Sequence, residues 1–266
     1  MIMKEYLYPL IGISLIFICT TLGAFFVFFI RKKEISPRLN KIFIGFAAGV
    51  MFSASFFSLI NPALETNVTY MPSWAVVAIS VVLGALFLWG IDKIVPHLHV
   101  GEEEEEGVKT KSMSKTGKMF LAVTIHNVPE GLSVGIAFGV ALSQPNNYVL
   151  LVGALLLAIG IGIQNIPEGA VVSLPLKAEM GSSKKAFLFG MLSGAVEPVA
   201  GVIGLFLAMQ IQGIMPWALA FAAGCMIYVV AEEMIPEMTS EGHDHYGVWS
   251  FIAGFVTMLI LDCIQL

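Results

Sequence analysis

Charged side chains are scarce in this sequence. Asp, Glu, Lys and Arg make up 12% of its 266 residues, against about 25% in a typical soluble domain. Hydrophobic residues reach 57%, and the mean hydropathy is +0.86. A soluble domain of this length could not hide so much apolar surface, so a lipid bilayer is its natural solvent. The net charge of −5 and the pI of about 5.5 argue against a nucleic-acid-binding surface.

Cysteine is also rare, and the three cysteines lie singly in apolar stretches without a C-x-x-C pair. That pattern is typical of small buried hydrophobic side chains rather than of a thiolate metal site. The first apolar stretch, residues 6–30, lacks a small-residue cleavage site and is too long for the core of a signal peptide. We therefore expect it to remain as a transmembrane helix.

Eight segments are long and apolar enough to cross a membrane, since a helical span takes about 20 residues. Lipid cannot satisfy free backbone groups, so segments of this length must be helices. We predict an all-α polytopic membrane protein whose residues 1–266 form one transmembrane domain. The expected helices are 6–30, 40–62, 73–95, 117–142, 148–176, 186–209, 213–236 and 247–264.

Basic residues occur in alternate loops. The loops after the first, third and fifth helices carry lysine or arginine, whereas 63–72, 143–147 and 210–213 carry none. Cytoplasmic loops are enriched in these residues. We therefore expect a multi-pass protein of the cell (inner) membrane with both termini outside.

The longest loop, residues 96–116, contains His97, His99 and five consecutive glutamates. Such a run is typical of a solvated tether. The alternative is that the loop collects metal ions weakly on the cytoplasmic side.

Two central helices carry a short repeat. Residues 126–131 read H-N-V-P-E-G and residues 164–169 read Q-N-I-P-E-G, both near the middle of a helix. Repeated segments in transporters tend to meet at the substrate site near the bilayer midplane. The sixth helix adds Glu197, also near its middle.

Ionisable side chains in the bilayer core cost about 2.5–3.5 kcal/mol each on insertion scales. Glu130, Glu168, Glu197 and His126 must therefore face one another, water or a cation. A divalent cation compensates several carboxylates at once, and His126 and Glu130 are spaced to share one helix face. Imidazole with carboxylates suits zinc, iron, manganese or cobalt. By contrast, Asp92 and Asp262 lie near helix ends and are expected at the membrane interface.

A proline precedes the glutamate in both repeats, at 129 and 167. Proline removes a backbone hydrogen bond within a helix, and membranes tolerate this where neighbours satisfy the freed group. We expect the fourth and fifth helices to be kinked and to lie at the core, packed closely through their glycines.

These motifs resemble those of the ZIP (Zrt/Irt-like) metal transporters, within them the GufA-like branch. S-L-P-L at 173–176, S-G-A-V-E-P at 193–198 and A-F-A-A-G at 220–224 extend the resemblance over nearly the whole chain. It implies import of zinc, with iron, manganese and cadmium as further candidates, and no prosthetic group, because the metal is the transported substrate. Many members carry a histidine where this chain has Gln164.

The resemblance also implies where the metal binds. A primary site would use His126, Glu130 and Glu168, and Gln164 stands beside it. An adjoining site would use Asn127, Asn165 and Glu197, with Glu130 and Glu168 able to bridge the two. Ser58 and Glu65 would form the entrance, and Glu232 or Glu233 the exit.

ZIP proteins are further expected to act as homodimers and by an elevator mechanism. Helices one, four, five and six would move as a block against helices two, three, seven and eight. The metal site would then be exposed alternately to the two sides of the membrane.

Three other functions remain open from the residues alone. The same carboxylates would serve as a relay in a proton- or sodium-coupled carrier of another small solute. An intramembrane metalloenzyme would need a motif such as H-E-x-x-H, which the sequence lacks, so we predict no enzymatic activity. A membrane scaffold would tolerate Glu168→Gln without loss of transport.

Overall fold

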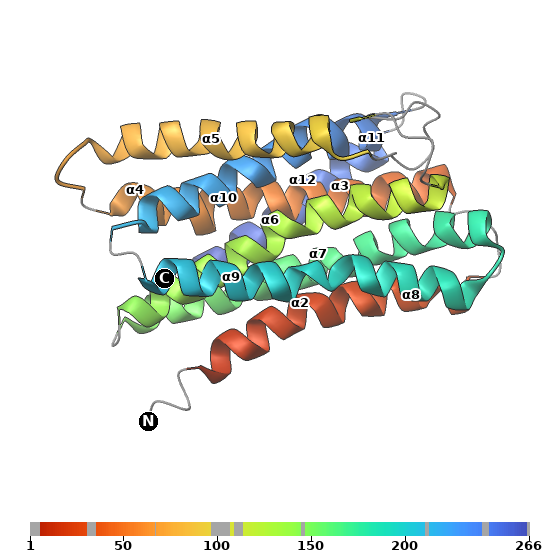
Figure 1. Ribbon diagram of the computed structural model, residues 1–266, viewed down its shortest axis with the longest axis horizontal. Helices are drawn as coiled ribbons and strands as arrows, with labels where there is room; N and C mark the ends of the chain where they lie inside the picture. Colours follow the sequence, from red (N-terminus) through yellow and green to blue (C-terminus); the bar gives the residue numbers. More distant parts are fainter. Residues whose placement is uncertain are drawn as a thin grey trace.

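The computed structural model shows a bundle of long helices that run side by side along one axis (Figure 1). Eight helices of its described part are long and apolar enough to cross a membrane, and no strand occurs there. The prediction of an all-α polytopic fold with eight spans is confirmed. His97, His99 and the glutamate run lie outside the described residues. Those residues are 6–30, 36–66, 68–96, 107–108, 114–144, 147–210, 213–240 and 245–264.

Four of the spans are composed of more than one helical element. The others are single α-helices, namely α5, α6, α7 and α12. In chain order the elements are α2 (Leu7–Phe25) with η1 (Phe26–Phe28); α3 (Pro37–Ala54), η2 (Ser55–Ile60) and α4 (Asn61–Glu65); α5 (Ser73–Ile94); α6 (Lys115–Ser143); α7 (Tyr148–Met180); α8 (Ser183–Gly194) and α9 (Val196–Gln210); α10 (Met215–Val229), η3 (Val230–Met234) and α11 (Ile235–Thr239); and α12 (Tyr246–Ile264).

Short polar side chains begin several of these helices. Ser36, Ser114, Asn147 and Ser182 each accept a hydrogen bond from the backbone N–H three residues ahead. Such caps satisfy backbone groups that the first helical turn leaves free. Helix α7 ends at Gly181, whose φ of 62° is the left-handed conformation common at helix ends.

Two of the spans contain a π-helical turn, η2 and η3. Each turn is followed by a proline, Pro62 or Pro236. Proline has no N–H to donate, so it interrupts the regular hydrogen bonding of the preceding turn. π turns inside helices are frequent at functional sites, and these two carry Ser58 and Glu233. The sequence periodicity did not indicate either turn.

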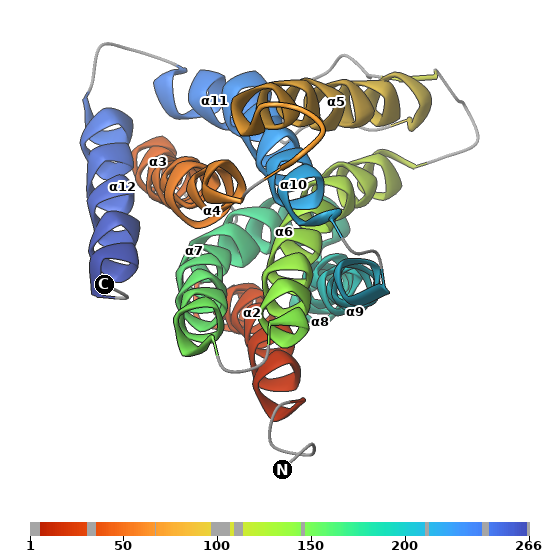
Figure 2. The same ribbon diagram turned by 90° about the vertical axis from the view of Figure 1, so that its left-hand side faces the viewer.

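The helices pack in two blocks. In the first block α6 packs on α9 and α2 on α7, and α8 joins them; in the second, α12 packs on α3 and α10 on α5. Seen along the bundle, α3, α5 and α10 lie above α2, α7, α8 and α9, and α12 lies to the left beside α3 (Figure 2). The first block is therefore α2, η1, α6, α7, α8 and α9. The second block is α3, η2, α4, α5, α10, η3, α11 and α12.

Glycines bring the helices within each block into backbone contact. A Cβ at Gly131 or Gly135 of α6 would collide with the backbone of α9, and one at Gly169 with that of α2. In the second block, Gly49 meets the backbone of α12 and Gly84 that of α10. Small residues allow this close approach in membranes, so the helix pairs α6–α9, α2–α7, α3–α12 and α5–α10 are each packed tightly.

Side chains form the boundary between the blocks. Gly160 of α7 faces the Met258 side chain of α12. Ile44 of α3, Val171 of α7 and Met238 of α11 form a small apolar cluster across the same boundary. Unlike the backbone contacts within a block, these contacts involve flexible side chains.

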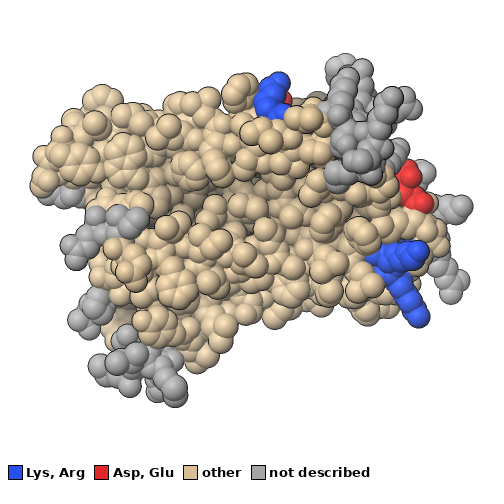
Figure 3. Space-filling view, in the orientation of Figure 1, with Lys and Arg blue, Asp and Glu red and all other residues tan. Residues whose placement is uncertain are grey.

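The two ends of the bundle differ in charge. Both chain termini lie at one end (Figure 1). The charged side chains visible on the face in Figure 3 lie in the half away from the termini. Residues of this second end include Lys41 and Lys118, which are both buried.

Candidate metal site

Polar side chains of α6, α7 and α9 meet in the interior of the first block. Asn127, Glu130, Gln164, Asn165 and Glu197 are each at most 1% exposed. The backbone contact of Gly131 with Glu197 brings α6 against α9 at this level. The two N-x-P-E-G segments therefore lie against each other, and Glu197 lies beside them. We call this set, together with Glu168, the midplane network.

Hydrogen bonds connect most of the midplane network. The Gln164 amide donates to Glu130 and, over 3.0 Å, to Asn165 Oδ1. Asn127 Nδ2 donates to Glu197 Oε1 at 3.2 Å and to the Ser193 carbonyl at 3.2 Å. The carboxylates also act electrostatically on one another across the network.

Thr20 of α2 completes the network, and sequence reasoning missed it. Its hydroxyl donates to Glu197 Oε1 at 2.6 Å and accepts from Asn165 Nδ2 at 3.0 Å. A threonine in an apolar helix usually bonds a carbonyl of its own helix, as Thr21 does with Phe17. No pattern in the sequence separates the two threonines.

Five oxygen atoms of the network have no hydrogen-bond donor in the described part of the chain. A buried acceptor without a donor costs about 1–3 kcal/mol, and more when it is charged. Oxygens of carboxylates and amides that lack donors are the ligands of a divalent cation. The network therefore presents several buried oxygens of the kind that a divalent cation binds. The atoms are Asn127 Oδ1, Glu130 Oε2, Gln164 Oε1, Glu168 Oε2 and Glu197 Oε2.

A second cluster lies nearer the charged end of the bundle. His126 Nε2 is 2.7 Å from Glu233 Oε1, and both side chains are 12% exposed. Together with Asp92 they offer three ligand atoms within 4.8 Å of one another. One nitrogen and two carboxylate oxygens suit zinc. We call this set the inner cluster.

The inner cluster changes two interpretations. The resemblance grouped His126 with Glu130 and Glu168; the structure turns its Nε2 toward Glu233 and Asp92, although His126 also acts electrostatically on Glu168. Asp92 was expected at the membrane interface, but it is 7% exposed. A place near a helix end indicates depth, whereas burial depends on which neighbours cover that face. The feature of the sequence that could have indicated the burial of Asp92 is a carboxylate within an apolar span.

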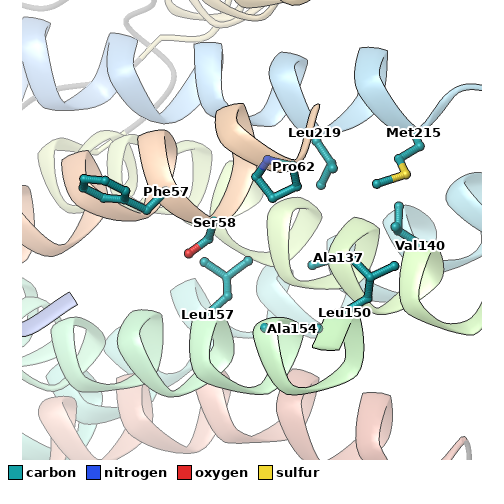
Figure 4. Close-up of a pocket in the computed structure, with 11 residues that line it drawn as sticks. Phe57, Ser58, Pro62, Ala137, Val140, Leu150, Ala154, Leu157, Met215 and Leu219 are labelled. Atoms are coloured by element: carbon teal, nitrogen blue, oxygen red, sulfur yellow. The ribbon is translucent and has the colours of Figure 1, made fainter. Parts of the chain in front are cut away.

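A pocket lies near the opposite end of the bundle, between η2, α4, α6, α7 and α10 (Figure 4). The Ser58 hydroxyl lines it and donates to Asp262 Oδ1 at 2.7 Å. Asp262 is therefore paired within the protein, although it was expected at the interface.

Glu65 and, at the charged end, Glu232 are exposed. Of the four expected entrance and exit residues, Ser58 lines a pocket and Glu233 joins a cluster.

Apolar side chains separate this pocket from the midplane network. Leu157 lines the pocket and Gln164 belongs to the network; seven residues of helix span about 10 Å. Between them, Ile161 and the neighbouring Val134 are 0% exposed. On the other side of the network, His126 and Glu233 keep some exposure. The site is thus more open toward the charged end.

Comparison with known proteins finds zinc transporters among the relatives of this chain. The family pattern described as "ZIP Zinc transporter" matches residues 6–119 and 103–262. The chain is 38% identical to "Zinc transporter GufA" of Myxococcus xanthus, over 91% of this chain and 93% of that protein. It is 34% identical to "Zinc transporter ZIP11" of Homo sapiens, over 91% and 93%. With "Zinc transporter ZIPB" of Bordetella bronchiseptica it shares 34% identity, over 96% of this chain and 80% of that protein.

Proposed function

This chain belongs to the ZIP zinc transporter family, in its GufA-like branch, and from that premise we propose that it carries zinc into the cytoplasm on the midplane network. The family consists of transporters of divalent metal rather than of enzymes. The ion is accordingly the transported substrate and not a resident cofactor. The finer steps below are our proposal.

The observation that supports the midplane network as the transport site is its set of five oxygens without donors. All of them belong to α6, α7 and α9, which form one block. Carboxylates buried in the apolar bundle are costly, and the repulsion between them adds to that cost. A divalent ion relieves both, because its charge is shared among several carboxylates.

We assign two adjoining positions to this network. His126, Glu130 and Glu168 hold the ion at the primary position, with His126 turning from Glu233 toward the network. Asn127, Asn165 and Glu197 form the adjoining position, and Glu130 and Glu168 can bridge the two. This list follows the resemblance, and the side-chain oxygens without donors on Asn127, Glu130, Glu168 and Glu197 support it.

Gln164 bears on the choice of ion. An amide oxygen is a harder ligand than imidazole, and its Nε2 is already engaged with Glu130 and Asn165. The site consequently presents mostly oxygen. We therefore include manganese and iron among the ions carried, with zinc first and cadmium, a softer ion, after them.

Transport by movement of the first block against the second is part of the proposal. Backbone contacts at glycines hold the helix pairs within each block together, whereas side chains form the boundary between the blocks. This contrast supports a sliding motion between rigid bodies. Ser58 and Glu65 then receive the ion outside, and the inner cluster with Glu232 releases it. Alternation of the open side follows from the motion.

The charged end of the bundle faces the cytoplasm in this proposal, which places both termini outside the inner membrane. The concentration of basic loops at that end supports the orientation. His97 and His99 would follow the inner cluster as weak ligands on the cytoplasmic side. A homodimer completes the proposal: the exposed stripe Ile252, Val256 and Ile260 of α12 offers an apolar face, and light scattering in detergent measures the mass.

Uptake into proteoliposomes that enclose a metal-sensitive dye tests the function. Zinc, manganese, iron and cadmium are compared for the wild type, His126→Ala and Glu168→Ala. Glu179→Ala, which removes an exposed carboxylate from the same helix as Glu168, is the matched control. We expect the first two variants to lose uptake and the control to keep it.

The opposite results are equally clear. A folded wild type that moves none of these ions would refute metal transport. Its carboxylates would then be tested as a proton or sodium relay with other solutes. Uptake that survives in both His126→Ala and Glu168→Ala would refute the assigned site.

A further inference from the structure

The hydroxyl of Thr20 lies at the centre of the buried hydrogen bonds that orient the midplane network. Thr20 is 3% exposed and comes from α2, a helix from which none of the proposed ligands comes. Its Oγ1 lies 2.6 Å from Glu197 Oε1 and 3.0 Å from Asn165 Nδ2. It therefore contacts the second N-x-P-E-G segment and the carboxylate of α9 at once.

A hydroxyl has one proton to donate, which decides the direction of these bonds. Thr20 Oγ1 lies 3.1 Å from the Ile16 carbonyl and 2.6 Å from Glu197 Oε1. The shorter contact, to a carboxylate, is of the kind that charge strengthens. With its proton on Glu197, the hydroxyl can only accept from Asn165.

This direction determines how two amides are turned. The Asn165 Nδ2 group faces Thr20. Asn165 Oδ1 therefore points away from Thr20 and accepts from Nε2 of its chain neighbour Gln164 at 3.0 Å. Gln164 then uses its second N–H for Glu130. Its oxygen is left without a donor among the described residues, so it is free for a cation. Without the hydroxyl, Asn165 would lose the acceptor that lies 3.0 Å from its Nδ2, and the carboxylates of Glu197 and Glu130 would be its remaining acceptors.

The same hydroxyl controls one carboxylate. Glu197 Oε1 accepts from both Thr20 and Asn127, whereas Glu197 Oε2 has no donor in the described part of the chain. The side chain is thereby held with one defined oxygen for a metal ion. Removal of the Thr20 hydroxyl would leave this carboxylate with the amide donors of Asn127 and Asn165 and without its shortest hydrogen bond.

We propose that Thr20 is a positioning residue of the transport site, whose hydroxyl sets the ligand oxygens of Glu197 and, through Asn165, of Gln164. The inference rests on the proposed function and adds to it a determinant of ion affinity and selectivity on α2. Thr20 does not itself bind the ion.

Packing at Thr20 can be separated from its hydroxyl. The Thr20 methyl carbon lies against Gly194 of α8, since a Cβ there would be 2.8 Å from Cγ2. Valine keeps this methyl group and the branched shape, so Thr20→Val removes the hydrogen bonds and retains the contact. Thr20→Ser does the reverse. Thr21→Val is the matched control, because among the described residues the Thr21 hydroxyl bonds the Phe17 carbonyl of its own helix alone, at 2.8 Å.

The test measures uptake kinetics of the full-length chain in proteoliposomes for zinc and manganese. We expect Thr20→Val to raise KM for zinc roughly tenfold, the size of effect of one lost hydrogen bond to a charged group. It should also change the ratio of zinc to manganese uptake. Thr20→Ser should restore both values, and Thr21→Val should keep them. Melting temperatures in detergent without metal check the fold, and Thr20→Ala replaces Thr20→Val if the latter is unfolded.

Several results would overturn the inference. One is a folded Thr20→Val with the KM and ion ratio of the wild type; another is a Thr20→Ser that is as impaired as Thr20→Val, since packing would then be the cause. A wild type that takes up no metal refutes the proposed function instead. In that case the zinc-dependent rise in melting temperature decides the inference, and equal rises in wild type and Thr20→Val overturn it.

Discussion

The midplane network and the inner cluster are both groups of polar side chains in an apolar bundle, but they are built from different parts of it. The network takes its side chains from α2, α6, α7 and α9, all in the first block. The inner cluster joins His126 of the first block to Asp92 and Glu233 of the second. A site within one rigid body keeps its geometry when that body moves, whereas a site across two bodies is formed in one state only.

This difference assigns separate tasks to the two sites. The network can hold an ion throughout a movement of the first block. In the movement that we propose, the inner cluster must break, since the 2.7 Å contact of His126 with Glu233 cannot survive a large displacement of one block against the other. The network is therefore suited to carrying, and the cluster to releasing the ion and holding one state.

A cross-link between the blocks gives the largest expected effect. Cysteines at Ile44 and Val171, which share the boundary cluster, are joined by a short thiol reagent in a background where the exposed Cys263 is serine. We expect uptake to stop completely, because the first block can no longer move, and to return when a cleavable linker is cut.

The control cross-link lies within the second block. The rings of Phe52 and Phe251 are 5.9 Å apart, and cysteines at these positions join α3 to α12, which move together in our proposal. Uptake should persist after this cross-link. If both cross-links stop uptake, or neither does, the division into two blocks is wrong.

Substitution in the two sites should separate binding from turnover. Glu130→Gln removes a charge from the network, and we expect zinc-dependent stabilisation to disappear.

Glu233→Gln weakens the contact between blocks and should change the maximal uptake rate several-fold, the effect of about 1 kcal/mol on a two-state equilibrium. Melting curves with and without zinc, together with uptake kinetics, measure both. Loss of zinc stabilisation in Glu233→Gln would show that the inner cluster is the main binding site.

The smallest effect is expected in the pocket lined by Ser58, which belongs to neither site. Ser58→Ala removes the donor to Asp262, and we expect KM for zinc to change by less than about fivefold, as for one neutral hydroxyl. Ser55→Ala is the control from the same π turn, since within the described part of the chain its hydroxyl bonds the Met51 carbonyl alone. A total loss of uptake in Ser58→Ala would mean that this pocket controls transport more than the network does.

Much of the fold follows from the sequence because lipid imposes simple rules on it. Long apolar runs must be helices, and the eight expected spans are found. The N-x-P-E-G repeat, with its costly carboxylates, pointed to the helices that meet in the core. The motifs resembling those of ZIP proteins indicated the family, which the relatives confirm.

Other features depend on which helix faces which. Asp92 is buried because neighbouring helices cover it, and its position in α5 alone suggested the interface. The partner of His126 at 2.7 Å is Glu233, a residue more than one hundred positions away in the chain. The π turns that present Ser58 and Glu233 depend on local hydrogen bonding that periodicity does not reveal.

The sequence by itself thus determined the number of spans and the polar residues that needed partners. Tertiary structure alone decided which partners they have. Thr20 and Thr21 show the reason: both are threonines in the same apolar helix, yet only Thr20 faces Glu197 and Asn165. Hydropathy is summed along the chain, whereas a ligand site depends on the rotation of each helix about its axis, and packing between helices sets that rotation.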